Sequence, residues 1–357
     1  MTNLQEVLQR AVRDGASDIF FIAGGYLSYK IDGKIYPDRT TIRLTPTETA
    51  YYIAEIYSAA KRSKDSFNQK GDDDFSFAVA NLARFRVNTY MQRGSQAAVI
   101  RVVAFDIPDP TTLGIPMDVI NLSRRHHGMI IISGTAGSGK STTQACIIDA
   151  INESREAHII TLEDPIEYLH RDKKSIISQR EVAIDTKNYL TGLRACLRQA
   201  PDVILLGEMR DPETIRTAIT AAETGHLVIA TLHTKGAVNT IDRIVDSFPA
   251  DQQDQIKIQL SLVLKCIVSQ QLLPRKEGGM IPAVEIMKTT PAVSNMIRDS
   301  KNYQIDNLIQ TSGNQGMISM DQYILNLFQA GLITGETAVS CAVNPEQMER
   351  KVEIGHK

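Results

Sequence analysis

The chain has 357 residues, which is too long for one typical domain and indicates two or three. Apolar residues make up 43% of it, enough for buried cores, and 39 basic and 41 acidic residues leave a net charge of −2. This balance excludes a chain that is basic throughout, so the overall charge does not point to nucleic-acid binding.

The four cysteines are far apart and form no C-x-x-C pair; they are Cys146, Cys196, Cys266 and Cys341. We therefore expect neither a zinc ribbon nor a disulfide framework, but small apolar side chains buried in a reducing compartment. Residues 1–13 are polar with helical spacing, unlike a signal peptide, and no apolar run approaches the ~18 residues of a membrane span. These features predict a cytosolic protein without a transmembrane segment.

Residues 1–105 are expected to form a separate α/β domain. Apolar residues at helical spacing predict a helix near the start of the chain. Asp32-Gly33, between two apolar residues, is typical of a two-residue hairpin turn, and Thr45-Pro46 predicts the start of the next helix with Thr45 as its cap. Strands are expected where apolar residues run or alternate, over 19–22, 29–31, 75–79, 84–89 and 97–105.

The segment 106–117 is the predicted connector between domains. It is rich in proline and contains Gly114, a composition that favours an extended, fairly stiff chain. From residue 118 to 357 strands alternate with helices, which is typical of a parallel sheet with a helical region after it. The apolar runs that predict these strands are 129–132, 158–162, 203–206 and 227–232.

A glycine-rich segment follows the first of these strands and precedes a predicted helix that begins near Lys140. Its sequence is Gly134-Thr135-Ala136-Gly137-Ser138-Gly139-Lys140-Ser141, followed by Thr142. The pattern G-x-x-x-x-G-K-[ST] in this setting predicts a nucleoside-triphosphate site, rather than a glycine turn without function. Glycines let backbone amides turn toward a phosphate, and the helix N-terminus adds positive potential. Lys140 is expected to reach the β- and γ-phosphates, and the Ser141 hydroxyl to bind Mg²⁺.

Polar side chains follow the other three predicted strands. Glu163 and Asp164 come after 158–162, Glu208 comes after 203–206, and His233 comes after 227–232. Ligand groups on a parallel sheet collect at the carboxyl ends of its strands. Hydrolysis of a nucleotide needs a carboxylate that orients or deprotonates water, an acid that holds Mg²⁺ and a polar sensor of the γ-phosphate. The strand ends supply a side chain for each of these roles.

Each of these residues also has a structural interpretation. Glu208 could pair with Arg210 or cap the helix that begins at Asp211-Pro212, and Glu163 with Asp164 could cap a turn at Pro165. A histidine at a strand end is often a satisfied structural group. The pattern of acids at the strand ends favours function for the carboxylates and leaves both interpretations open for His233.

Arg84, Arg86 and Arg93 are predicted to form a basic strand face in the first domain. Such a face is usually solvated. The alternative is that it donates to a phosphate bound by a neighbouring subunit, as arginine fingers do. The sequence leaves both open.

Four segments together resemble a known superfamily. The glycine-rich loop and the segments 161–168, 202–211 and 225–234 are similar to the Walker A, Asp box, Walker B and His box of the secretion ATPases. The resemblance is strongest to the PilT family of type IV pilus retraction (twitching motility) ATPases, and it covers nearly the whole chain. It includes Gly15-Ala16-Ser17-Asp18, the strand 84–88 and the segment 240–249.

This resemblance implies a cytoplasmic homohexameric motor, with a PAS-like N-terminal domain, a RecA-like P-loop ATPase domain and ATP bound between them. It assigns catalysis to Glu208, support of water and Mg²⁺ to Glu163 with Asp164, and sensing of the phosphate state to His233. Arg84, Arg86 and Arg93 map to arginines that reach the nucleotide. Hydrolysis would turn an inner-membrane platform protein, at the cytoplasmic face of that membrane, and so withdraw pilins from the filament.

The C-terminal segment 292–299 is similar to the family's retraction-specific segment, with Ser294 where the family usually has arginine. The four-cysteine zinc site typical of pilus assembly ATPases is missing, which favours the retraction branch. The alternatives are an accessory retraction ATPase, a secretion-system ATPase and, from another class, a nucleic-acid translocase on the same core. A GTP switch is disfavoured because no Asn-Lys-x-Asp motif occurs, and an ATP-binding scaffold is disfavoured by the complete set of acids.

Overall fold

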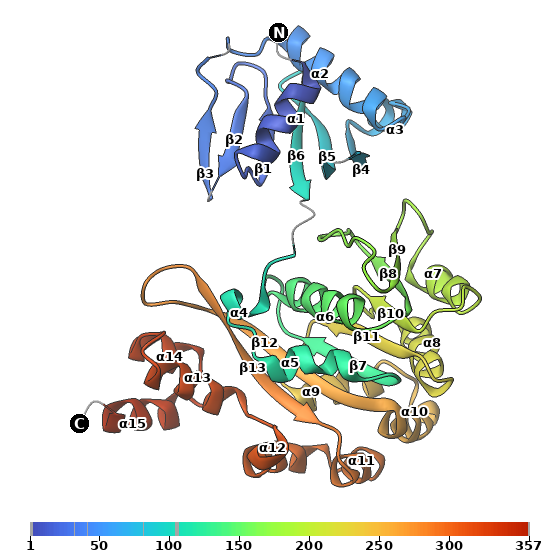
Figure 1. Ribbon diagram of the computed structural model, residues 1–357, viewed down its shortest axis with the longest axis vertical. Helices are drawn as coiled ribbons and strands as arrows, with labels where there is room; N and C mark the ends of the chain where they lie inside the picture. The colour runs from blue at the N-terminus through green and yellow to red at the C-terminus, as the bar shows by residue number, and fades with distance from the viewer. Residues whose placement is uncertain (1–2, 32, 41, 81, 104–106, 356–357) are drawn as a thin grey trace. The chain divides into compact units, whose positions relative to one another are not determined.

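The computed structural model describes residues 3–31, 33–40, 42–80, 82–103 and 107–355. The chain divides into two compact units, one of residues 1–106 with 167–169 and one of residues 107–166 with 170–357. Figure 1 labels the helices and strands of both.

The first unit is built on a six-stranded antiparallel sheet in the order β3-β2-β1-β6-β5-β4. Its strands are β1 (Asp18–Phe21), β2 (Ser28–Ile31), β3 (Lys34–Pro37), β4 (Asp72–Val79), β5 (Ala83–Gln92) and β6 (Ser95–Val103). Its helices are α1 (Leu4–Arg13), α2 (Pro46–Ala59) and α3 (Asp65–Lys70). Apolar residues of the helices and of the sheet form one core.

Local sequence signals explain where several of these elements begin. Helix α2 starts at Pro46 as predicted, because the Thr45 side chain accepts from the Glu48 amide and Glu48 reaches back to the Thr45 amide. The predicted turn at Asp32-Gly33 lies between the paired strands β2 and β3, but Asp32 is outside the described residues. The last residues of the strand predicted over 97–105 are also outside them.

The second unit is built on a seven-stranded sheet in the order β13-β12-β7-β11-β10-β8-β9. All neighbours from β12 to β9 are parallel, which confirms the predicted parallel sheet, whereas β13 runs antiparallel to β12. The strands are β7 (Gly128–Ser133), β8 (His158–Glu163), β9 (Ile176–Glu181), β10 (Val203–Leu206), β11 (Leu227–Leu232), β12 (Leu264–Pro274) and β13 (Met280–Lys288). The predicted runs 203–206 and 227–232 coincide with β10 and β11.

Helices cover both faces of this sheet (Figure 1). One face packs against α5 (Met117–Ile120) and α6 (Lys140–Ser154). The other packs against α7 (Tyr189–Cys196), α8 (Pro212–Glu223), α9 (Ala237–Asp246), α10 (Ala250–Val263), α11 (Pro291–Arg298) and α12 (Ile305–Thr311). The C-terminal helices α13 (Met320–Gln329), α14 (Gly335–Cys341) and α15 (Pro345–Gly355) form a further core with residues of β12 and β13. Because both faces are covered, the central strands are continuous apolar runs.

The proline-rich segment 106–117 differs from the extended connector expected. A short helix, α4 (Pro110–Leu113), lies within it. Asp109 caps this helix through the Thr111 amide, Pro110 occupies its first turn, and Gly114 ends it in the left-handed conformation. Pro110 and Gly114 therefore mark the two ends of a helix. Composition alone had indicated a stiff, extended segment instead.

The four cysteines are unpaired; Cys146, Cys196 and Cys266 are buried and Cys341 is partly exposed. None of the described helices has the length and apolar character needed to cross a membrane.

Candidate functional site

The order of the strands in the second sheet brings the predicted site residues to one edge. β7, which precedes the glycine-rich loop, lies beside β11, followed by β10 and β8. The registers pair Leu232 with Ser133, and Leu206 with both Ala230 and Leu162. The residues that follow these strands therefore emerge side by side at their carboxyl ends.

The glycine-rich loop turns sharply from β7 into α6, which begins at Lys140 as predicted. Gly134 has a φ of 146°, and a Cβ there would lie 2.2 Å from the Gln270 carbonyl oxygen and 2.6 Å from Ser138 Oγ. Gly139 has a φ of 84°, and a Cβ there would lie 2.8 Å from Gln270 Nε2. Both positions therefore require glycine, for conformation and for space.

The Lys140 side chain is folded into the loop. Its Nζ donates to the carbonyl oxygens of Gly134 at 2.9 Å and Thr135 at 2.8 Å, and the residue is buried. The ammonium group therefore lies inside the curve of the loop. From this position it can reach a phosphate that the loop binds.

The loop also fits a phosphate and its Mg²⁺ by its polar groups. Ser138 Oγ is buried and has no hydrogen-bond partner among the described residues, so a polar group of the loop is left for a ligand. Ser141 and Thr142, in the first turn of α6, are partly exposed. Ser141, Glu163 and Asp164 supply oxygen atoms, the ligand type that Mg²⁺ prefers.

Gln270 of β12 is a loop-binding residue that the sequence reasoning missed. Its side chain accepts from Thr143 Oγ1 at 2.8 Å and donates to the Ser138 carbonyl oxygen at 2.7 Å, and it is buried. It thereby joins the loop to the first turn of α6. No local motif marks this glutamine, because its partners lie more than a hundred residues earlier in the chain.

Glu208 follows the end of β10 and contacts two basic side chains, those of Arg210 and His233. It forms an ion pair with Arg210, and its Oε2 is 3.4 Å from Nε2 of His233. The Glu208 side chain is 10% exposed, whereas that of His233 is 53% exposed. The hydrogen bond that Arg210 donates to the Glu208 carboxylate raises the pKa of Arg210. The pair with Arg210 agrees with the structural interpretation of Glu208, whereas Asp211, not Glu208, caps α8.

Glu163 and Asp164 lie at the end of β8 on the same edge. Glu163 Oε1 accepts from Thr161 Oγ1 at 2.6 Å and from Gln179 Nε2 at 3.2 Å. Tyr189 of α7, which the sequence reasoning also missed, is influenced by the charges of this edge. Burial raises the pKa of its hydroxyl, and the charges of the three carboxylates raise it further. The charges of Glu208, Asp164 and Glu163 therefore all act on this hydroxyl.

Comparison with known proteins gives the family. Residues 1–319 match the family model described as "Type II/IV secretion system protein". The chain is 42% identical over 346 residues to the "Type IV pilus retractation ATPase PilT" of Pseudomonas aeruginosa, covering 96% of this chain and 99% of that protein. It is 46% identical over 318 residues to the "Twitching motility protein" of Neisseria gonorrhoeae, covering 88% and 85%. The chain belongs to the PilT family of secretion ATPases.

A solved structure supports the same assignment for the fold. The crystal structure of "the Pilus Retraction Motor PilT and Bound ADP" matches with a TM-score of 0.90 and 45% identity, over 98% of this chain and all of that one. The predicted fold class, an N-terminal α/β domain followed by a P-loop ATPase domain, is confirmed as that of the PilT family.

The arginines of the first unit do not form the single strand face that was predicted. Arg84 and Arg86 share one face of β5, where Arg86 pairs with Asp74 at 2.7 Å. Arg101 of β6 is directly opposite Arg86 and pairs with Asp18, so it is a basic residue of this face that was missed. Arg93 follows the end of β5 and has a φ of 51°, so it lies in the turn to β6 and not on that face.

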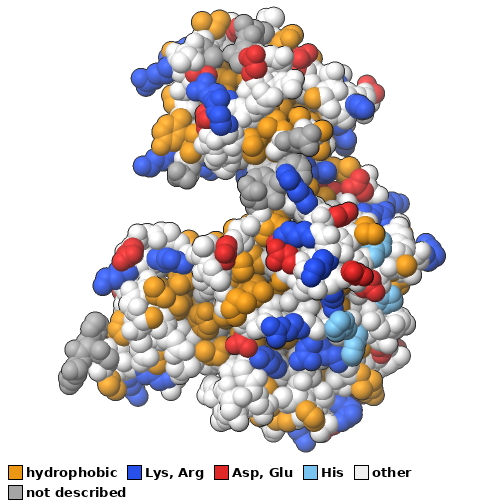
Figure 2. All heavy atoms as spheres, in the orientation of Figure 1, with side chains coloured by type: hydrophobic (Ala, Val, Ile, Leu, Met, Phe, Trp, Pro, Cys, Tyr) orange, Lys and Arg blue, Asp and Glu red, His pale blue; other side chains and the backbone are white. Residues whose placement is uncertain are grey.

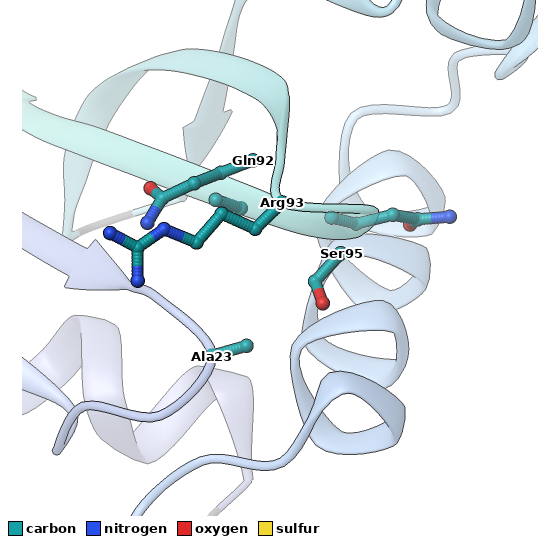
Figure 3. A pocket seen from close by; sticks show the side chains of 6 residues that line it. Ala23, Gln92, Arg93 and Ser95 are labelled. Carbon is teal, nitrogen blue, oxygen red and sulfur yellow. The ribbon is translucent and has the colours of Figure 1, made fainter.

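Arg93 instead lines a small pocket at the far end of β5 (Figure 3). The pocket has a volume of about 60 Å³, and Arg93 lies there with Gln92, Ser95 and Ala23. Since a strand rises ~3.3 Å per residue, the eight steps from Arg84 to Gln92 span roughly 26 Å. Arg93 is therefore separate from Arg84 and Arg86 within this unit.

Proposed function

We propose that this protein is a motor ATPase that hydrolyses ATP to ADP and phosphate to drive type IV pilus retraction, and so twitching motility. The observation that carries the proposal is the full-length match, at 45% identity, to a pilus retraction motor with bound ADP. The geometry of the strand ends supports it, because the phosphate loop, Glu163, Glu208 and His233 emerge from neighbouring strands.

The residues at this edge divide the chemistry between them. The loop amides of 134–139, the N-terminus of α6 and Lys140 bind the phosphates. Ser141, Glu163 and Asp164 would hold Mg²⁺ directly or through water, and the ion would supply positive charge that offsets the charge of the phosphates. Glu208 orients or deprotonates the attacking water. His233, in contact with Glu208, senses whether the γ-phosphate is present.

The proposal includes a homohexamer in the cytoplasm, at the cytoplasmic face of the inner membrane. Its partner there is the platform protein of the pilus machinery, through which it acts on the pilins indirectly. The domains are 1–105, PAS-like, and 118–357, RecA-like with a C-terminal helical region, joined by 106–117. Arg84, Arg86 and Arg93 donate to nucleotide phosphates, with Arg93 acting from a different place on the first unit than the other two.

The test is ATP turnover of the wild type against Glu208→Gln, with the oligomeric state measured by light scattering on the same samples. Glutamine keeps the size of the side chain and removes its basicity. We expect a hexameric wild type that hydrolyses ATP, and a variant that keeps the ring and binds ATP but turns over at least ~100-fold more slowly.

The matched control is Glu213→Gln. Glu213 lies in the first turn of α8, five residues after Glu208, and its 3.4 Å pair with Arg194 is exposed on both sides. This control should turn over ATP at the wild-type rate. A monomer with equal turnover in Glu208→Gln would contradict both the ring and the role of Glu208.

The second candidate function is that of an accessory retraction or secretion-system ATPase. The observation that favours it is Ser294, which lies on α11 and donates to the Ser261 carbonyl oxygen at 2.9 Å, where retraction ATPases usually have arginine. Measuring pilus retraction in a deletion strain separates the two functions. A nucleic-acid translocase is less well supported, because acidic and basic side chains are interspersed on the face of the molecule that Figure 2 shows.

A further inference from the structure

Glu285 is a buried carboxylate in the sheet of the second unit. It lies on β13 and is 8% exposed. Its Oε1 accepts from the Ala237 amide at 2.8 Å, and its side chain also accepts from the Met320 amide. Ala237 is the first residue of α9 and Met320 the first residue of α13. One carboxylate therefore binds the N-termini of two helices.

Helix α9 has no side-chain cap from its own segment, whereas α13 also has Ser319 as its N-cap. The residue before α9 is Gly236, which has no side chain to cap the helix, so the acceptor comes from a distant strand. Among the residues that the structure describes, Glu285 has no ion-pair partner, and burial raises its pKa, with Asp306 and Asp321 adding to the effect. Burying a carboxylate without a cation is costly, so the two amides and the helix N-termini offset that cost.

The sheet register connects Glu285 to the catalytic edge. Glu285 is opposite Ser269 of β12, Ser269 is opposite Ser133 of β7, and Ser133 is opposite Leu232 of β11. Ser269 Oγ accepts from the Gly236 amide at 2.9 Å. The two consecutive amides of Gly236 and Ala237 are thus fixed by a serine and a carboxylate of neighbouring strands.

These two amides close the loop that carries His233. The loop leaves β11 after Leu232 and enters α9 at Ala237, and within it Thr234 Oγ1 bonds Thr240 Oγ1 at 2.8 Å. The His233 ring is 53% exposed and contacts Glu208. Because so much of the ring is in solvent, the two ends of the loop, and not packing around the ring, set its position.

We propose that Glu285 is a positioning residue for His233. It fixes the start of α9 and, with Ser269, holds the loop so that the imidazole stays against Glu208. The inference rests on the proposed ATPase function and on the sensing role of His233. Through the Met320 amide, Glu285 also contacts the start of α13, so the first of the C-terminal helices and the His233 loop share one carboxylate.

The experiment is a double-mutant cycle on ATP turnover, with wild type, Glu285→Ala, His233→Ala and the double variant. We expect Glu285→Ala to lower kcat by ~10-fold, because a small displacement of a catalytic group has effects of this order, with KM for ATP within about 2-fold. In the His233→Ala background the same change should have little further effect, because the group that it positions is gone.

Two further variants separate positioning from a loss of folding. Glu285→Gln keeps one acceptor for the Ala237 amide but turns an amide N–H toward that of Met320, so its kcat should fall less than that of Glu285→Ala. Ser269→Ala removes the acceptor for the Gly236 amide without touching the buried charge, and should lower kcat in the same direction. If Glu285→Ala does not fold, the cycle of Ser269→Ala with His233→Ala replaces it.

The outcomes distinguish this inference from the proposed function. Equal factors for Glu285→Ala in the two backgrounds would overturn the positioning role and leave the ATPase and the sensor in place. Wild-type turnover in His233→Ala would overturn the sensor and the positioning role together, and leave the ATPase. A wild type without turnover would overturn the proposed function itself.

Discussion

At the scale of single residues, Gln270 supports the glycine-rich loop from a strand that is distant in the sequence. It holds the Ser138 carbonyl and the Thr143 hydroxyl, and it is buried. In Gln270→Leu, which is similar in size, both partners lose a buried hydrogen bond at a cost of about 1–3 kcal/mol each when unpaired. We expect the affinity for a fluorescent ADP analogue to fall at least ~10-fold, since 1.4 kcal/mol corresponds to that factor.

The adjacent Gln271→Leu is the control for this prediction. Gln271 points to the other face of β12, where it donates to the Cys341 carbonyl at 3.1 Å, away from the loop. The control should bind the analogue as the wild type does. Equal affinities in all three proteins would mean that the loop keeps its conformation without Gln270.

His170 makes the stability of the second unit depend on pH. Burial lowers its pKa to about 4 from the ordinary value of 6.5. Between these values the unfolded chain binds a proton that the folded chain does not, so the free energy of unfolding decreases as the pH falls. From pH 7 to pH 5 this costs about 2 kcal/mol, given 1.36 kcal/mol per pKa unit.

The measurement is thermal or denaturant unfolding of the wild type and His170→Gln at both pH values. Glutamine does not titrate, so the difference between the two proteins isolates the histidine from the other ionisable groups. The wild type should lose about 2 kcal/mol more than the variant on going to pH 5. An equal loss would mean that His170 takes up its proton in the folded state.

At the scale of elements, caps decide where helices of the site begin. Asp211 caps α8 just after the Glu208–Arg210 pair, accepting from the Thr214 amide at 2.8 Å and from its hydroxyl at 2.7 Å. We expect Asp211→Ala to lower the free energy of unfolding by about 1–2 kcal/mol, whereas Asp211→Asn, an equally good cap, should stay close to the wild type. Denaturant unfolding of the three proteins measures this. Equal stability of the alanine and asparagine variants would show that the cap does not contribute.

Elements with a strong local signal could be predicted from the sequence. Strands β10 and β11 are unbroken apolar runs. Helix α2 begins directly after a capping threonine, and α6 begins at the lysine of the loop. The pair β12–β13 could not be predicted in this way, because an antiparallel edge added to a parallel sheet has no distinctive pattern of its own. The helix α4 was missed because its prolines were interpreted by composition and not by position.

At the scale of the whole molecule, the sequence could predict the positions of candidate site residues that local motifs mark, but not of those that depend on distant pairing. The loop, Glu163, Glu208 and His233 follow strands that are neighbours in the sheet, so one rule about strand ends places them all. Gln270 and Tyr189 lie at this edge beside residues of other elements, and Arg101 of the first unit pairs with Asp18, 83 residues earlier. Their partners become visible only when the strand order and register are known.

The position of β12 in the sheet has a consequence for synthesis. This strand supplies the second neighbour of β7 and also Gln270, which lies 127 residues after its partner Thr143. At ~5–20 residues per second, a ribosome needs on the order of ten seconds to add that length of chain. During that interval the growing polypeptide contains the glycine-rich loop but not Gln270, whose side chain binds the loop. We therefore expect nucleotide binding by the new chain to begin only after β12 has emerged and paired with β7.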